Sequence, residues 1–236
     1  RYENITESDV NLILDTMNNN PLICHAERDQ KIRGAYKNLT DERYHGNQWD
    51  MKRIGMEDVW DYTQGSGDVI VAVLDTGVDY THPDLFQNMV CGYDFFNDDP
   101  DPYDDAYDTY HGTRVAGIIA ARGNNGMGIA GMAWKVKIMP LKIFSMDFEG
   151  YFTIAIKAID YAIANDASII NASWGYPYES PELMCAIARA RNAKIIVVAS
   201  AGNDGIDIDK NPYYPASYDY ENIISVANST KLDTLS

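Results

Sequence analysis

Three polar side chains in this 236-residue sequence occupy places where they could act together in chemistry. Asp75 ends a run of apolar residues, His111 begins a stretch of small apolar residues, and Asn203 follows a second apolar run. An imidazole can take and return a proton near neutral pH, a carboxylate behind it fixes its tautomer, and an amide can donate to developing negative charge. Taken singly, each has a structural explanation, as a turn-capping Asp, a structural His and a turn-forming Asn.

The element that must position Asp75 is the run of six apolar residues at 69–74. Bounded by glycines upstream and a turn downstream, it is typical of a strand buried on both faces, as found in parallel sheets. In open α/β sheets, ligands and chemistry lie at the carboxyl edge. Further strands are expected at 136–144, 167–172, 194–199 and 223–227, alternating with helices near 56–61, 111–121, 150–165 and 180–192. The pattern predicts an α/β fold of three layers, with a mostly parallel sheet and helices on both faces.

The residues around the three polar side chains decide how they are interpreted. They read DTGV at Asp75, HGTRVAG at His111 and SAGN at Asn203. With these neighbours and in this order, the chain resembles the subtilisin-like serine peptidases over most of residues 45–236, with some features similar to thermitase-like members. The resemblance implies that Asp75 orients the imidazole, that His111 is the general base and that Asn203 donates to the oxyanion. It implies an endopeptidase that hydrolyses peptide bonds of protein or peptide substrates.

The nucleophilic serine of that family is not found in the sequence. In the family it lies in a Gly-Thr-Ser-Met-Ala type block at the head of a later helix, and no such block occurs up to Ser236. We therefore expect a fragment that ends before the nucleophile, with the subtilisin-like fold incomplete at its C-terminus and no activity in this chain alone. The alternative is a catalytically inactive, peptide-binding relative. Retention of acid, base and amide together favours the peptidase, because a binding module gains nothing from a base.

A first calcium site is implied by three separated segments. They are Asp41, HPDL at 82–85 and the Gly- and Asn-rich loop 122–131, and Ca²⁺ prefers carboxylate, amide and main-chain oxygens. A plain Gly-rich turn is the structural alternative. The ligands that the resemblance implies are Asp41, Asp84, Asn125 and the carbonyl groups of Met127 and Ile129.

A second calcium site is implied at the densest acidic stretch, residues 97–105. A solvated acidic loop is the default interpretation of such a stretch. In thermitase-like relatives a calcium ion occupies this place, and the residues that match its ligands are Asp94, Asp99 and Asp101.

The segment Ser173-Trp174-Gly175 follows the strand expected at 167–172. In the family this segment forms a wall of the pocket for the residue before the scissile bond. Trp174 and Arg114 are similar to the kexin branch. Tyr176 stands where many subtilisins have a glycine, which leaves the width of the pocket open.

Residues 1–30 resemble the carboxyl end of the inhibitory propeptide that precedes such catalytic domains, and would act as an intramolecular inhibitor. A short amphipathic helix with Ser8 as its N-cap is expected at 7–17 and a strand at 22–29, for which a generic helix and strand is the alternative. Residues 31–47 are polar and are expected to form a linker or processing region and the mature N-terminal arm. Residues 48–236 would be the truncated peptidase catalytic domain.

The composition excludes several classes of function. A net charge of −16 argues against nucleic acid as a partner, and no apolar run approaches 18 residues, so no membrane association is expected. The acidic surplus fits calcium binding and an extracellular, secreted protein. Three widely separated cysteines without a CxxC indicate neither a zinc site nor a disulfide framework. No GxGxxG or GxxxxGK[ST] follows the first strand, which argues against a nucleotide-binding protein.

Overall fold

A computed structural model of the chain describes residues 6–20, 41, 48–106, 109–232 and 234. The chain divides into two compact units, Arg1–Ala35 and Tyr36–Ser236. In the first unit, α1 (Glu7–Asn18) confirms the helix expected at 7–17. Its N-cap is Thr6 rather than Ser8, because the Thr6 hydroxyl accepts from the Asp9 N–H while the Asp9 carboxylate accepts from the Thr6 N–H. The strand expected at 22–29 lies outside the described residues.

A six-stranded sheet forms the centre of the second unit, in the order β2-β3-β1-β4-β5-β6. Every pair of neighbouring strands is parallel. The five expected strands are present, whereas the two-residue β2 is too short to leave a pattern in the sequence. The strands are β1 (Ile70–Asp75), β2 (Tyr93–Asp94), β3 (Lys137–Lys142), β4 (Ile169–Ala172), β5 (Ile196–Ser200) and β6 (Ile223–Val226).

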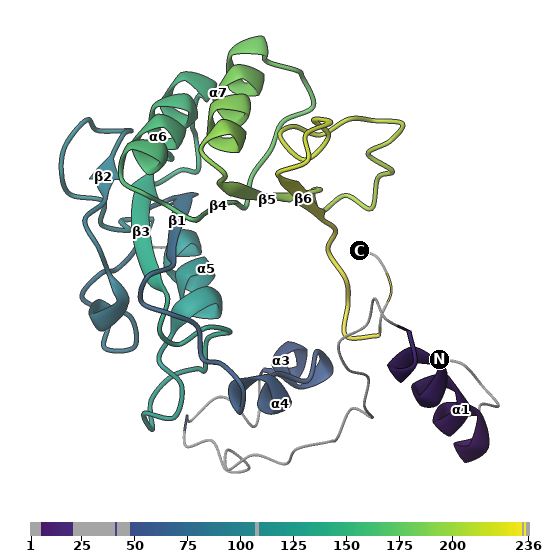
Figure 1. Cartoon of the computed structure of the whole chain (residues 1–236). Coiled ribbons are helices and arrows are strands. Elements are labelled where there is room, and N and C mark those ends of the chain that lie inside the picture. Colours follow the sequence, from purple (N-terminus) through teal and green to yellow (C-terminus); the bar gives the residue numbers. More distant parts are fainter. Residues whose placement is uncertain (1–5, 21–40, 42–47, 107–108, 233, 235–236) are drawn as a thin grey trace. The chain divides into compact units, whose positions relative to one another are not determined.

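Helices cover the sheet from both sides, with α6 and α7 on one face and α5 on the other (Figure 1). The expected three-layer α/β fold is thereby confirmed. Within the described residues, no helix combines the length and the apolar character needed to cross a membrane. The helical elements of this unit are α3 (Trp49–Arg53), α4 (Met56–Trp60), the 3₁₀ turn η1 (Phe86–Asn88), α5 (His111–Ala120), α6 (Phe152–Ala164) and α7 (Pro181–Asn192).

The side chains of β1 alternate between the two layers of helices. Ala72 and Leu74 belong to the core cluster with α6 and α7, whereas Val71 and Val73 pack with residues of α5. Because successive side chains of a strand point to opposite faces, Asp75 follows Val71 and Val73 on the face that α5 covers. The strand thus delivers the carboxylate to the side of the sheet where His111 begins its helix.

The two short helices α3 and α4 pack against the loop that follows α5. Met51 and Trp60 form a cluster with Ala130 and Trp134, and Trp60 Nε1 donates to the Met132 carbonyl at 2.9 Å. The buried Gln48 side chain donates to the Ala130 carbonyl and accepts from its N–H. These contacts hold the carboxyl end of the loop at 122–131.

Gly112 allows α5 to begin directly against the end of β1, and its replacement gives a first testable expectation. A Cβ at this position would lie 2.1 Å from the Gly77 carbonyl oxygen, a main-chain atom that cannot move aside. We expect Gly112→Ala to destabilise the fold by about 1–3 kcal/mol, which lowers the melting temperature by roughly 2–4 °C per kcal/mol. Thermal unfolding followed by circular dichroism measures this shift.

Gly117→Ala is the matched control on the same helix. A Cβ there would meet only the Ile129 Cδ1 atom, at 3.3 Å, at the end of a flexible side chain. We expect this variant to keep a melting temperature close to that of the unchanged chain. Equal losses in the two variants would show that the close approach of Gly112 to Gly77 does not matter.

Candidate active site

Asp75 and His111, which lie 36 residues apart in the sequence, form a hydrogen-bonded pair at the carboxyl end of β1. His111 Nδ1 lies 2.8 Å from Asp75 Oδ1 and 2.9 Å from Oδ2. The Asp75 side chain is 1% exposed, whereas the His111 ring is 38% exposed. The carboxylate is therefore fixed behind the ring, while the ring itself can be reached from solvent.

The pairing sets both the tautomer and the basicity of His111. A carboxylate that accepts from Nδ1–H leaves Nε2 with a free lone pair on the exposed side. The hydrogen bond with Asp75 raises the pKa of the His111 imidazole above its ordinary value, against the opposing effect of burial. Because a general base acts in its neutral form, activity that depends on this ring should rise as the pH increases through that raised pKa.

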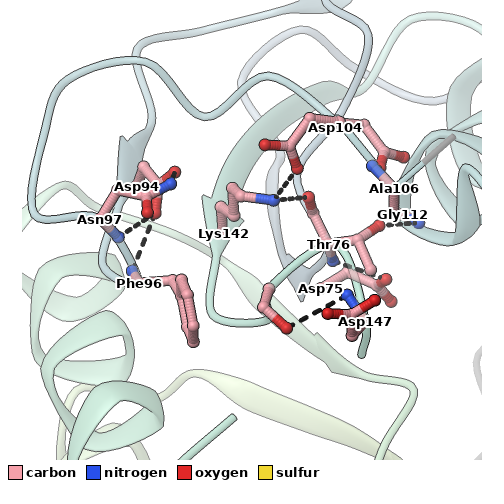
Figure 2. A network of polar contacts seen from close by, with 12 residues as sticks. Asp75, Thr76, Asp94, Phe96, Asn97, Asp104, Ala106, Gly112, Lys142 and Asp147 are labelled. Atoms are coloured by element: carbon pink, nitrogen blue, oxygen red, sulfur yellow. Dashed lines mark hydrogen bonds and ion pairs between the residues drawn. The ribbon is translucent and has the colours of Figure 1, made fainter. Parts of the chain in front are cut away.

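A network of hydrogen bonds that the sequence did not indicate fixes the Asp75 carboxylate and the first turn of α5 (Figure 2). Thr76 N–H donates to Asp75 Oδ1 at 2.8 Å, and Thr76 Oγ1 accepts from the Gly112 N–H at 3.0 Å. Asp104, which is fully buried, accepts from the N–H and the hydroxyl of Thr113 at 3.0 and 2.7 Å. A carboxylate at a helix N-terminus is favourable, because it meets unpaired N–H groups and the positive end of the helix dipole. The first turn of α5 is therefore fixed from two directions.

An aromatic cavity of about 620 Å³ lies near the imidazole. Phe148, which lines it, meets the His111 ring edge-on with 5.0 Å between the ring centroids. Trp174 and Gly175 also line the cavity. Ser173 is not among its lining residues, and its hydroxyl oxygen accepts a hydrogen bond of 2.9 Å from Asn171 Nδ2. The other lining residues are Ile143, Phe144, Glu149, Gly150, Tyr151, Phe152, Ala155 and Tyr176.

The candidate oxyanion residue Asn203 lies in the turn after β5 and is exposed. Since all strands are parallel, the ends of β1, β4 and β5 carry Asp75, the 173–175 segment and Asn203 along one edge of the sheet. The structure thus brings all three parts of the expected site to the same edge.

The ring of Tyr213 packs against the candidate site, a contact that the sequence did not indicate. A Cβ on Gly175 would lie 2.4 Å from the Tyr213 ring, so this ring packs directly against the wall segment. Tyr213 also approaches Gly202, the residue before Asn203. Tyr176 and Tyr214 exchange main-chain hydrogen bonds of 2.9 Å beside it. Because the contacts with Gly175 and Tyr176 join residues 38 positions apart, no local pattern could have indicated them.

The structure brings three of the implied ligands of the first calcium site together, the side chains of Asp41, Asp84 and Asn125. Asp41 and Asp84 are 1% and 2% exposed, and both meet Asn125, which donates its N–H to Asp41 Oδ1 and its side-chain amide to Asp84 Oδ1. Met127 and Ile129 donate their N–H groups to Asn125 Oδ1 and Asp84 Oδ2, and the role of their carbonyl groups as ligands stays a prediction from the sequence. Among the described residues, the hydrogen bonds to these two buried carboxylates come from uncharged groups. The oxygen-rich, negatively charged site therefore fits a Ca²⁺ ion.

The three carboxylates implied for the second calcium site each have a local partner. Asp94 accepts from the N–H groups of Phe96 and Asn97 and from the Asn97 side chain, all at 2.8 Å. Asp99 accepts from the Asp101 N–H, and Asp101 from the Tyr80 hydroxyl. In the described parts of the chain, no three His, Cys, Asp or Glu side chains gather as a metal site. The second site stays a prediction from the sequence.

Comparison with known proteins identifies the class of protein to which this fold and site belong. The model of the subtilase family matches residues 66–236. The chain belongs to the subtilase family.

Three relatives show how much of such a protein the chain represents. It is 37% identical to a thermophilic serine proteinase of Bacillus sp. (strain AK1), over all of this chain and 56% of the relative. It is 37% identical to thermitase of Thermoactinomyces vulgaris, over 83% of this chain and 67% of thermitase. It is 39% identical to an intracellular serine protease of Paenibacillus polymyxa, over 71% of this chain and 51% of that protein. The chain thus spans about half to two thirds of these relatives.

Proposed function

We propose that this chain is the part of a serine endopeptidase that bears its acid, its base and one oxyanion donor, with the nucleophilic serine in a further segment. The observation that carries the proposal is the buried carboxylate of Asp75 held against His111 Nδ1. Burial of a carboxylate away from water costs free energy of folding. A protein that only binds peptides would gain nothing from this cost, whereas a peptidase uses the carboxylate to orient its base. Two of the reported relatives are named as a serine proteinase and a serine protease, which agrees with the proposal.

In the proposed reaction each residue has one task. His111 Nε2 takes the proton from the serine hydroxyl as its oxygen attacks the peptide carbonyl, and later returns it to the leaving amine. Asp75 keeps Nδ1–H in place and stabilises the imidazolium that forms. Asn203 donates its side-chain amide to the oxygen that becomes negative. Water then attacks the acyl-enzyme, with His111 again as the base.

An exposed apolar face of the sheet is evidence that a further segment packs beside α5. Ile196, Ile224 and Val226 are 41%, 51% and 46% exposed on β5 and β6. The register places them on the same face as Val71 and Val73, where α5 packs mainly against β1 and β3. A helix that covers this face would lie on the side of the sheet from which His111 is presented. We propose that the segment with the nucleophile packs here.

The substrate would bind along the carboxyl edge of the sheet. The aromatic cavity beside His111 suits an apolar side chain of a peptide, since most of its lining side chains are apolar or aromatic. The ring of Tyr213 occupies space between Gly175 and Gly202, which narrows the region next to Asn203. A peptide-binding relative without activity would use the same surface and remains the alternative outcome of the test below.

Calcium is proposed as the cofactor at the site formed by Asp41, Asp84 and Asn125. A bound ion would supply positive charge to two buried carboxylates and would tie the loop at 122–131 to the N-terminal arm. Binding to the native state alone stabilises it by mass action. The ion would act on stability and not on the proton transfer.

We expect calcium to raise the melting temperature of this chain, by an amount that depends on Asp84. At free calcium about 100 times the Kd, the stabilisation would be about 2.7 kcal/mol. Asp84→Ala should remove most of the difference between calcium and chelator, measured by thermal unfolding. Asp160→Ala removes a carboxylate from a surface ion pair with Arg189 and should keep the full difference. A calcium effect that is the same in both variants would show that the ion does not bind at Asp84.

Two further proposals concern maturation and location. Residues 1–30, which include α1, are proposed to be the end of an inhibitory propeptide, and cleavage is expected in the polar region at 31–47. Extracellular location rests on the acidic surface, while one relative is named as intracellular. Amino-terminal sequencing of the protein secreted from its natural host would test both proposals.

Expression of the complete gene tests the proposed function. The product should hydrolyse a protein substrate, and a reagent that phosphonylates reactive serines should stop this activity and label one serine outside residues 1–236. A complete product that binds peptides without cleaving them and resists the reagent would support the peptide-binding alternative instead.

A further inference from the structure

One lysine lies buried at the carboxyl end of the sheet, close to the candidate catalytic pair. Lys142 ends β3, and its side chain is 1% exposed. In the described part of the chain it is the one buried cation, whereas five aspartates are buried. A buried ammonium is stable only where anions and hydrogen-bond acceptors surround it. The partners of Lys142 therefore indicate what it does.

Lys142 occupies the middle of a row of charged residues. It stands opposite Asp75 on β1 and opposite Asp94 on β2. Opposite residues of neighbouring strands point to the same face, so all three side chains lie on the side that α5 covers. Figure 2 shows the lysine between Asp94 on one side and the turn after Asp75 on the other.

The first hydrogen bond of Lys142 reaches the turn that follows Asp75. Its Nζ donates to the Thr76 carbonyl oxygen at 2.7 Å. Thr76 in turn donates its N–H to Asp75 Oδ1 and accepts from the N–H of Gly112, the residue after His111. One turn residue therefore links the ammonium to both members of the pair.

The second hydrogen bond reaches the loop that caps α5. Lys142 Nζ lies 2.6 Å from Asp105 Oδ1. The preceding residue, Asp104, accepts from the N–H and hydroxyl of Thr113 in the first turn of the helix. The lysine thus also fixes the loop from which the His111 helix starts.

We infer that Lys142 is a positioning residue of the proton-transfer site, whose ammonium fixes the Thr76 turn and the Asp104–Asp105 loop and thereby the approach of Asp75 to His111. The inference rests on the proposed function, in which this pair carries the proton. The hydrogen bonds that the structure describes for Lys142 go to Thr76 and Asp105, so it acts through Asp75 and not on substrate.

The pKa of His111 distinguishes positioning from a plain charge effect. Asp75 and Asp104 raise this pKa, and Arg114 lowers it. Loss of the positive charge of Lys142 alone would raise the pKa further, because a nearby cation disfavours protonation. Loosening of the Asp75 hydrogen bond would lower it, because that bond is the main cause of the raised value. The two effects have opposite signs.

The test is an NMR titration of the imidazole of His111 in this chain, assigned with His111→Gln. We expect Lys142→Met to lower the pKa of His111 by about 0.5–1 unit. The matched control is Lys137→Met, at the other end of β3, where the ammonium binds the Gln87 carbonyl. It should leave the pKa unchanged. An unchanged or raised pKa in Lys142→Met overturns the inference.

Two more variants keep the result decisive. Asp75→Asn should lower the pKa of His111, and if it does so while Lys142→Met does not, the positioning role fails and the proposed function stands. If Asp75→Asn has no effect, the pair itself is wrong and both proposals fall. Should Lys142→Met not fold, Lys142→Gln removes the same positive charge and keeps a polar side chain at this buried position, and a lowered pKa is again required.

Discussion

His111→Ala should lower kcat of the complete enzyme by about 10⁶, because it removes the imidazole that takes the serine proton in the proposed reaction. In subtilisin, loss of the base alone costs on the order of 2 × 10⁶ in kcat, nearly as much as loss of the whole triad. KM should change little, since the ring does not hold the substrate before reaction. Steady-state hydrolysis of a chromogenic peptide measures both constants.

Asp75→Asn extends this expectation to the buried carboxylate. An amide in its place can keep the contact of 2.8 Å but allows the wrong tautomer, which costs about 10⁴ in kcat in serine peptidases. Asp79→Asn is the matched control, because Asp79 lies four residues further on, where its carboxylate caps the Thr81 turn. It should stay within about threefold of the unchanged enzyme, as expected of a surface change. Equal losses of kcat in the two variants would show that Asp75 does not orient His111 in the reaction.

Asn203→Ala carries the second largest expected effect, a loss of about 10²–10³ in kcat with KM nearly unchanged. The exposed amide can reach a ligand at the sheet edge, and a donor aimed at developing negative charge acts mainly in the transition state. Removal of such a donor raises the barrier by about 2.7–4 kcal/mol. The same assay measures the change.

Asn192→Ala serves as the control for this substitution. Asn192 ends α7, the helix on the opposite face of the sheet from α5. We expect its activity to equal that of the unchanged enzyme. A rise in KM without a fall in kcat for Asn203→Ala would assign Asn203 to substrate binding in place of the oxyanion.

The central strand and the pairing of Asp75 with His111 could be predicted from the sequence because their signals are local. The apolar run at 69–74 is long enough to specify a buried strand, and the flanks of Asp75 and His111 are distinctive. The two-residue β2 has no such signal, because its partner β3 and not its own pattern makes it a strand.

The supports of the site were missed because they depend on tertiary contacts. The stretch that contains Lys142 was recognised as a strand, yet lysine is usually exposed and nothing local shows that its ammonium is buried. Asp104 looked like part of a solvated acidic loop, but the start of α5 buries it completely. In both cases residues elsewhere in the chain supply the hydrogen-bond partners that offset the cost of burying the charge: Thr76 and Asp105 for Lys142, and Thr113 for Asp104.

A crystal structure of the complete enzyme with a peptide boronic acid tests the central claim most directly. A boronate on the serine imitates the tetrahedral intermediate, so its oxygens mark the positions of the oxyanion and the water. We expect one oxygen within about 2.7–3.1 Å of the Asn203 amide, and His111 Nε2 in hydrogen-bond distance of the serine oxygen or the second boronate oxygen. Asp75 should still hold Nδ1. A boronate whose oxygens avoid Asn203, or a serine that binds it far from His111, would contradict the assignment of these three residues to one site.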